Sequence, residues 1–239
     1  MIGTIARLTR MSLLRGWRGI LLALLPAALL LLAVAIRGMV GGEEQQVVDL
    51  VLGGLTMGTV VPLIALIVGT GAISTEVDDG SIVYLLTKPI PRWKIVLTKF
   101  AVATVIALLF AALPTYAAAM ILTGGDGVVA IAYGVAAVVA CLVYCALFVM
   151  LGVLSRQAVI IGLVYVLLWE NLVTGLIGGT RVLSVQHWAT SLASTVASGR
   201  IPADVHVVVA AVLAGLTTVG AVWYASRRLR SLTLAGGEA

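Results

Sequence analysis

The sequence predicts an all-α membrane protein with six transmembrane helices, and two observations carry this prediction. The chain of 239 residues is 62% hydrophobic and only 10% charged, which leaves too few charges to cover the surface of a water-soluble domain. Six windows are each apolar over the roughly 20 residues that a bilayer crossing needs. Each must be helical, because unpaired backbone groups find no water in lipid. The expected helices, all in a single domain over residues 1–239, are about 19–40, 48–74, 98–122, 127–154, 157–178 and 205–226.

The Lys and Arg residues predict which connections face the cytoplasm. With the N-terminus in the cytoplasm, only Arg37, Arg181 and Arg200 face outward. The remaining cations then face inward: Arg7, Arg10, Arg15, Arg18, Lys88, Arg92, Lys94, Lys99, Arg156, Arg227, Arg228 and Arg230. Because cytoplasmic loops carry the excess of Lys and Arg, both termini are expected in the cytoplasm and the loop 179–204 outside. The basic charge then reflects topology and attraction to anionic lipids, not nucleic-acid binding.

The leader, residues 1–18, has an amphipathic pattern. Its four arginines fall on one side of a helical wheel, opposite Ile2, Ile5, Ala6, Leu13 and Trp17. Such an N-terminal interfacial (elbow) helix would lie along the membrane surface with its apolar face in the acyl chains. The alternative is an irregular leader with ordinary positive flanks. Cleavage as a signal peptide at Ala33-Val34-Ala35 is disfavoured, because the apolar run is longer than a usual signal core.

The connection 74–99 is the least expected stretch, because seven of the 25 charged residues crowd into it. They are Glu76, Asp78, Asp79, Lys88, Arg92, Lys94 and Lys99. Ser74 or Thr75 can cap a new helix whose first turn holds the acids, and Pro89 and Pro91 would end it. Its apolar stripe comprises Ile82, Val83, Leu85 and Leu86. That stripe either dips into the lipid interface or docks a cytoplasmic protein.

This connection resembles the first cytoplasmic loop of ABC-2-type permeases, the membrane subunits of bacterial ATP-binding-cassette exporters. It carries the run Glu76-x-x-x-Gly80-Ser81-x-x-x-Leu85-Leu86-x-Lys88-Pro89-Ile90-x-Arg92 and continues to Lys99. A second resemblance is the Trp169-Glu170 pair of the fifth span, within "GLVYVLLWENLVTGL". Ser81 departs from the family's usual threonine, and Asn171 from a usual small residue.

The resemblance implies a transmembrane domain like that of type V exporters, in which the loop 74–99 couples a separate ATPase to the membrane helices. The residues expected to couple are Glu76, Asp78, Asp79, Gly80, Ile82, Leu85, Leu86, Lys88, Pro89, Arg92 and Lys99. The implied partners are two copies of a cytoplasmic ATPase, a second permease chain (a homodimer is favoured over a heterodimer) and membrane lipids of the bacterial plasma membrane. No cofactor is expected on this chain. ATP and Mg²⁺ belong to the ATPase, since the sequence has no G-x-x-x-x-G-K-[ST].

Glu170 and Asn171 are the candidate residues of the translocation path or its gate. An ionised carboxylate inside a span costs about 2.5–3.5 kcal/mol even on the lenient insertion scale. Glu170 must therefore face protein or water, be protonated or find a partner. A hydrogen-bonded glutamate that only holds helices together is the equally weighted alternative. The spans otherwise offer few polar groups, which favours a hydrophobic or amphipathic cargo.

Other features are less specific. Cys141 and Cys145 lie one turn apart and are expected to be packing thiols, with no metal. Gly54-x-x-x-Gly58 permits close helix approach, and Pro26, Pro62 and Pro114 are expected to kink their helices. Residues 181–202 are long enough for a short outer helix, and His187 and His206 are expected to be interfacial. An intramembrane enzyme is disfavoured, because the apolar windows hold one acid and no histidine, while a scaffold without transport stays an alternative.

Overall fold

The computed structural model describes residues 17–40, 45–78, 92–201 and 203–231, and all regular structure in these residues is helical. Six helical stretches in the described ranges are long and apolar enough to cross a membrane: Gly19–Met39, Gln46–Ile73, Trp93–Leu122, Gly127–Leu154, Ala158–Leu176 and Val207–Leu229. The predicted all-helical, six-span fold is therefore confirmed. The third span begins at Trp93, several residues before the expected position 98.

The spans are built from the following elements. The first span is α2 (Trp17–Val40), and the second joins α3 (Gln45–Val48), the π-helical η1 (Asp49–Val60) and α4 (Val61–Asp78). The third joins α6 (Arg92–Ala107), the π-helical η2 (Leu108–Ala112) and α7 (Leu113–Leu122). The fourth is α8 (Gly127–Leu154), and the fifth joins α9 (Ala158–Val164), the π-helical η3 (Tyr165–Val173) and α10 (Thr174–Leu176). The 3₁₀-helix η4 (Gly178–Leu183) and α11 (Val185–Val196) lead to the sixth span, α12 (Val207–Ser231).

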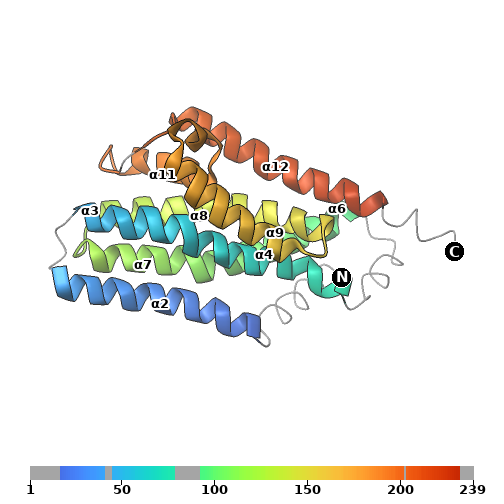
Figure 1. Cartoon of the computed structure of the whole chain (residues 1–239), viewed down its shortest axis with the longest axis horizontal. Coiled ribbons are helices and arrows are strands. Elements are labelled where there is room, and N and C mark those ends of the chain that lie inside the picture. Colours follow the sequence, from blue (N-terminus) through green and yellow to red (C-terminus); the bar gives the residue numbers. More distant parts are fainter. Residues whose placement is uncertain (1–16, 41–44, 79–91, 202, 232–239) are drawn as a thin grey trace.

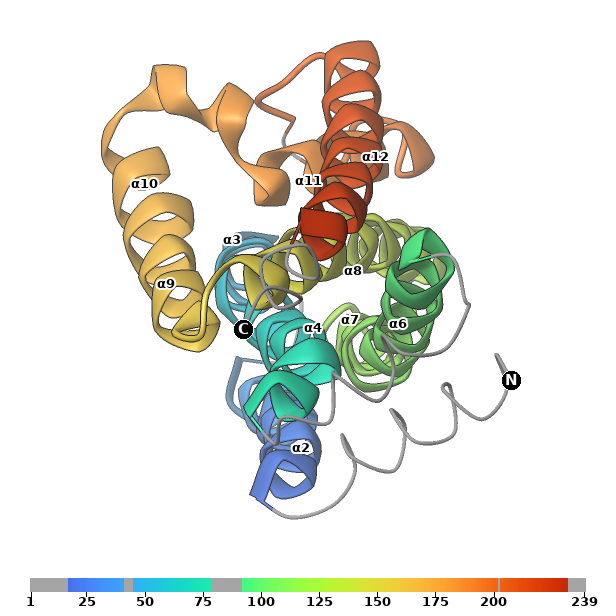
Figure 2. The same ribbon diagram turned by 90° about the vertical axis from the view of Figure 1, so that its right-hand side faces the viewer.

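Helix α8 is the centre of the bundle and contacts α4, α6, α7, α11 and α12 (Figure 2). Its side chains are apolar on all faces, as expected for a helix buried within a membrane protein. Tyr133, Tyr144 and Phe148 fill the largest buried positions along it. Asp126 caps its start by accepting hydrogen bonds from the backbone amides of Val128 and Val129. Cys141 and Cys145 are free thiols buried on the same helix.

Two of the π-helical segments end just before a proline. Val61 donates its amide to Thr56 and Leu113 donates to Leu108, five residues back in both cases, and Pro62 and Pro114 follow directly. In an α-helix a proline ring would clash with the carbonyl four residues earlier. The wider π turn is one of the known ways to accommodate such a helix distortion. Pro26, by contrast, lies within the uninterrupted α2.

The two ends of the bundle differ in composition. Helix α2 begins and α12 ends at one end, whereas α3, α11 and the start of α8 lie at the other (Figure 1). At this second end Arg37 donates to the carbonyl of Leu122, Arg181 pairs with Asp204, and Arg200 pairs with Asp126. These are the three arginines that the sequence predicted to lie outside. Each of them has a polar partner in the structure.

The structure corrects one expectation about the connection between the second and third spans. Helix α4 continues without a break to Asp78, so neither Ser74 nor Thr75 caps a new helix. Glu76 and Asp78 lie instead in the last turn of α4. Between Gly71 and Asp78 the sequence contains no proline or glycine that would end the helix.

Candidate functional site

The residues expected to couple to an ATPase fall into three groups. Glu76 and Asp78 lie in α4, and Arg92 is the first residue of α6. Lys99 lies about two turns further along α6. The remaining residues are outside the described part of the chain: Asp79, Gly80, Ile82, Leu85, Leu86, Lys88 and Pro89. Their coupling role stays a prediction.

Lys99 has a different environment from the one expected. The sequence counted it among the cations that face the cytoplasm, but its side chain is only 2% exposed. Its ammonium group donates a hydrogen bond of 2.6 Å to the carbonyl of Ala72 in α4. A charged donor bound to a backbone carbonyl is one way in which a membrane helix bundle satisfies a buried charge. Lys99 therefore joins the second and third spans.

Glu170 is 1% exposed, and its carboxylate accepts three hydrogen bonds. Oε1 accepts from the Tyr165 hydroxyl at 2.8 Å and from the Val185 amide at 3.1 Å, and Oε2 accepts from Ser184 Oγ at 2.5 Å. Hydrogen bonds to the ionised form satisfy a buried carboxylate. The geometry thus supports a structural role, in which Glu170 joins the fifth span to the first turn of α11.

Two side-chain amides join the second span to the fifth span and α11. Asn171 Nδ2 donates to the carbonyl of Gly58 at 2.9 Å, and Gln186 Nε2 donates to the carbonyl of Gly53 at 2.7 Å. Pro62, four residues after Gly58, has no N–H to offer that carbonyl. A Cβ on Gly58 would lie 3.0 Å from Asn171 Oδ1 and 2.9 Å from Gln186 Oε1. Glycine at position 58 therefore permits this approach.

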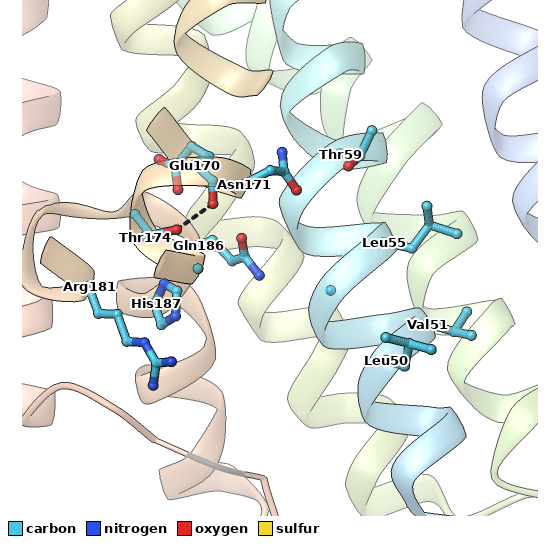
Figure 3. A pocket seen from close by; sticks show the side chains of 12 residues that line it. Leu50, Val51, Leu55, Thr59, Glu170, Asn171, Thr174, Arg181, Gln186 and His187 are labelled. Carbon is cyan, nitrogen blue, oxygen red and sulfur yellow. Dashed lines mark hydrogen bonds between the residues drawn. The ribbon is translucent and has the colours of Figure 1, made fainter. Parts of the chain in front are cut away.

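A cavity of about 570 Å³ lies between the second span, the fifth span and the start of α11 (Figure 3). Its volume is within the usual range for small-molecule sites. One wall is the apolar surface of η1, with Leu50, Val51 and Leu55. The opposite wall is polar and carries Glu170, Asn171, Thr174, Arg181, Gln186 and His187. The cavity therefore presents an amphipathic lining, and both residues that the sequence assigned to the path or gate border it.

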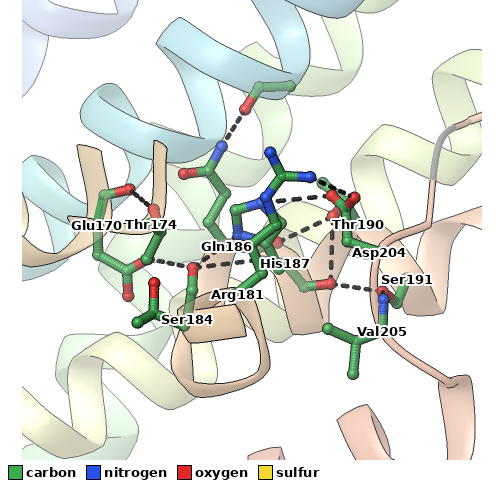
Figure 4. Close-up of polar contacts among 12 residues, drawn as sticks. Glu170, Thr174, Arg181, Ser184, Gln186, His187, Thr190, Ser191, Asp204 and Val205 are labelled. Atoms are coloured by element: carbon green, nitrogen blue, oxygen red, sulfur yellow. Dashed lines mark hydrogen bonds and ion pairs between the residues drawn. The ribbon is translucent and has the colours of Figure 1, made fainter. Parts of the chain in front are cut away.

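A chain of polar side chains extends from Glu170 toward the end of the bundle (Figure 4). Ser184 donates its hydroxyl proton to Glu170, and His187 Nδ1 lies 3.0 Å from the same Ser184 Oγ. His187 Nε2 lies 3.4 Å from Asp204 Oδ2, and Arg181 binds the same carboxylate at 2.7 Å. Burial lowers the pKa of His187 below its ordinary value of 6.5, although Asp204 acts in the opposite direction. The network thus links Glu170 to Asp204 and Arg181 through Ser184 and His187.

The Ser184, His187 and Asp204 side chains have the composition of a hydrolytic triad but not its geometry. Ser184 is completely buried, and its hydroxyl is already bound to Glu170. A nucleophile must reach a substrate carbonyl while a base removes its proton. Within the described residues, no group of three or more His, Cys, Asp or Glu side chains could hold a metal ion. This network orders a loop and has no catalytic arrangement.

The sequence did not identify Ser184, Gln186, His187 and Asp204 as one network. Their contacts depend on how η4 turns the chain back toward the fifth span, and no local motif encodes that turn. A useful signal was available in the buried carboxylate itself. Glu170 needed donors, and the polar sequence "SVQH" that follows η4 supplies them.

Six apolar spans, of which α8 is the central one, with an amphipathic cavity between two of the others, define a multi-pass membrane protein of the transporter type. The chain belongs to the ABC-2 family: the family model described as "ABC-2 family transporter protein" matches residues 5–226. No curated protein matches the chain. The resemblance seen in the sequence is confirmed, and with it the chain is a transport permease, not itself catalytic. Permeases of this family generally pair with a cytoplasmic ATPase.

Proposed function

We propose that this chain is the permease subunit of an ATP-driven exporter in the bacterial plasma membrane, with both termini in the cytoplasm. The cavity between the second and fifth spans carries the proposal, because it is bordered by the one acid within the fifth span and by the amides that hold the two spans together. In this proposal the cavity is part of the translocation path.

The contacts around the cavity suggest how it would open. The second and fifth spans are joined by Asn171 on Gly58, and Gln186 adds a bond from α11 to Gly53. Hydrogen bonds between membrane helices contribute only about 0.6 kcal/mol each on average. Motion of an attached ATPase could therefore break these hydrogen bonds and form others at a small cost in free energy. The carboxylate of Glu170, with three donors, would keep η4 and α11 attached to the fifth span during that motion.

The connection 74–99 would transmit the motion of the ATPase to the membrane helices. A pair of ATPase subunits that binds ATP and Mg²⁺ would dock there, on the Ile82, Leu85 and Leu86 stripe. Residues 1–18 would form the interfacial helix at the same membrane face. Each permease chain would supply one half of the passage, and we favour a homodimer over a heterodimer because the small residues in the spans allow close helix pairing.

The cavity lining suggests the class of cargo. One wall is apolar, and the other offers a guanidinium, an imidazole, two amides and the Glu170 carboxylate, whose oxygens already accept three hydrogen bonds. An amphipathic molecule with a polar or anionic head and an apolar body would complement both walls. We propose that such a molecule is exported.

The proposal is tested by reconstituting the chain with the ATPase subunit that co-purifies with it. Leu55→Trp would fill the apolar side of the cavity and is expected to reduce cargo-stimulated ATP hydrolysis to the basal rate. The matched control is Leu31→Trp, on the exposed face of α2, which is expected to keep full stimulation. Equal stimulation of ATP hydrolysis in both variants would show that the cavity is not part of the translocation path.

Docking is tested separately with Leu85→Asp combined with Leu86→Asp. We expect this variant to remain in the membrane and to lose co-purification of the ATPase. If the ATPase still co-purifies with full stimulated hydrolysis, the stripe is a lipid-surface element. If wild-type chain binds the ATPase but never stimulates it with any cargo, the chain is a scaffold, a function that the structural bonding of Glu170 would also permit.

A further inference from the structure

A second groove, of about 480 Å³, lies between the first turns of α6 and the last turns of α12, at the end of the bundle opposite α11 (Figures 1 and 2). Helix α6 contributes Trp93, Leu97 and Phe100. Helix α12 contributes Val219, Val222 and Trp223. The groove faces outward from the bundle, since Val219 is 70% and Trp223 54% exposed.

The walls of this groove are apolar in effect, even where they carry hydroxyls. Thr218 donates to the carbonyl of Ala214, and Ser226 donates to that of Val222. Both hydroxyls are thus bound to the backbone of their own helix, so they need no partner inside the groove. An occupant must therefore be apolar along most of its length.

One end of the groove is cationic. Arg227 lines it and stands over the ring of Trp223, with its guanidinium carbon 4.2 Å from the ring centroid. Lys94 directly follows Trp93, which lines the groove, and its ammonium lies 5.5 Å from the centroid of the Trp93 ring. In the described part of the chain, neither cation makes an ion pair with a carboxylate. An anionic group at this end would complement both cations.

Another outward-facing groove shows that the cations between α6 and α12 are not a general property of the lipid-facing surface. It has a similar volume, about 540 Å³, and lies between the third span and α8. Leu109, Leu113, Ile131 and Val138 are among its lining residues, and none of its lining residues is charged. It therefore serves as an internal control.

We infer that the groove between α6 and α12 binds one anionic phospholipid, with an acyl chain along Leu97, Val219 and Val222 and the phosphate at Arg227 and Lys94. Two tryptophans, each with a cation near its ring, are typical of the membrane–water interface. Basic pockets between transmembrane helices are known to bind anionic head groups. The inference does not depend on transport, on its direction or on the ATPase.

Native mass spectrometry of the purified full chain tests the site, with phosphatidylglycerol and phosphatidylcholine of identical acyl chains as probes. We expect tighter binding of the first phosphatidylglycerol, by about fivefold for each cation engaged. Arg227→Gln should lower that preference about fivefold, whereas Arg156→Gln, an exposed cation in the connection between α8 and α9, should leave it unchanged.

The groove itself is tested by filling it. Val219→Trp should weaken binding of the first lipid, and Leu109→Trp, in the uncharged groove, should not change the preference for phosphatidylglycerol. Brominated phosphatidylglycerol should quench tryptophan fluorescence less in Trp223→Phe than in wild type. Equal affinity for the two lipids in wild type, or equal effects of Arg227→Gln and Arg156→Gln, would overturn the inference. Disulfide formation between two copies of Val219→Cys would also overturn it, because the groove would then be a protein interface.

Discussion

Glu170 shows how one buried acid can organise a whole connection. Its two oxygens accept bonds from Tyr165 within the fifth span and from Ser184 and Val185 at the start of α11. An acid in a membrane span is costly unless such partners exist. Here the cost is offset by bonds that fix η4 and α11 relative to the fifth span.

Replacing Glu170 by Ala is expected to destabilise the protein by about 2 kcal/mol, because three donors lose their acceptor at once. Tyr165→Phe removes one of these bonds and is expected to cost about 0.6 kcal/mol. Thermal unfolding in a mild detergent measures both variants. A smaller effect for Glu170→Ala than for Tyr165→Phe would contradict the structural role of the carboxylate.

His187 makes the stability of the region around α11 depend on pH. Burial lowers its pKa below 6.5 in the folded protein, against the opposing effect of Asp204. The unfolded chain then binds this proton more readily, so stability is lost as the pH falls below about 6.5. We expect the melting temperature to fall from pH 7 to pH 5, and to fall less in His187→Gln. An identical pH profile for both proteins would show that His187 is not the titrating group.

At the scale of single residues, the sequence identified the important position but not its partners. It marked Glu170 as a residue that needs an explanation, yet Ser184 and Val185 lie 14 and 15 residues away in the chain. Lys99 shows the opposite case. Its charge served only to predict which side of the membrane it faces, whereas in the structure its ammonium group binds the carbonyl of Ala72.

Among the elements, the second span is the most irregular. Its π-helical η1 ends two residues before Pro62, and the carbonyl of Gly58 accepts a bond from Asn171 of the fifth span. A hydrogen-bond acceptor deprived of one donor by the proline is thus used by a neighbouring helix. Irregular backbone in a membrane is tolerated where other groups satisfy it.

A double-mutant cycle tests this link between Pro62 and Asn171. In Pro62→Ala a new backbone N–H can bind the Gly58 carbonyl, so Asn171→Ala should cost less in that background than in wild type. We expect a coupling energy of about 0.5–1 kcal/mol from unfolding measurements. Simple additivity of the two changes would mean that the missing N–H is unrelated to the Asn171 bond.

The existence of every span could be predicted, whereas the division of each span into α-helical and π-helical segments could not. Long apolar runs give helices of either α or π form, because both satisfy the backbone internally. The prolines were expected to distort their spans, but Tyr165–Val173 is π-helical without one. The end of α4 at Asp78 was missed for a related reason: polar residues were taken as a boundary, although they do not stop a helix.

For the whole molecule, we expect the orientation in the membrane to follow from charge. The three cations at the α11 end each have a polar partner, and two of them pair with carboxylates. The opposite end carries Lys94, Arg156 and Arg227, all exposed. Arg92 at the start of α6 and Arg228 near the end of α12 lie at the same end, so five cations there exceed the three at the α11 end. Such an excess is the signal for the cytoplasmic face.

This orientation predicts the accessibility of introduced cysteines. Gln157→Cys should react with a membrane-impermeant thiol reagent only from the cytoplasm, and Gly127→Cys only from outside. Gly127 is suitable because a Cβ there meets nothing within 4 Å, whereas Gly125 has a φ of +99° that disfavours a side chain. The native thiols of Cys141 and Cys145 are buried and should give little background. If each position were labelled from the opposite side instead, the topology would be the reverse of the one expected here.

The contact of Asn171 with Gly58 also has an evolutionary consequence. The Asn171 amide binds a backbone carbonyl of the second span, so this bond does not depend on the identity of most side chains there. The exception is position 58, where a Cβ would block the approach of Asn171. We expect relatives that keep Asn171 to keep both Gly58 and Pro62 with it. Gly54, whose Cβ would meet only Leu50 at 4.0 Å, should be replaced freely by alanine. Where a lineage has a small residue in place of Asn171, selection on Gly58 and Pro62 should relax, so these three positions are expected to covary.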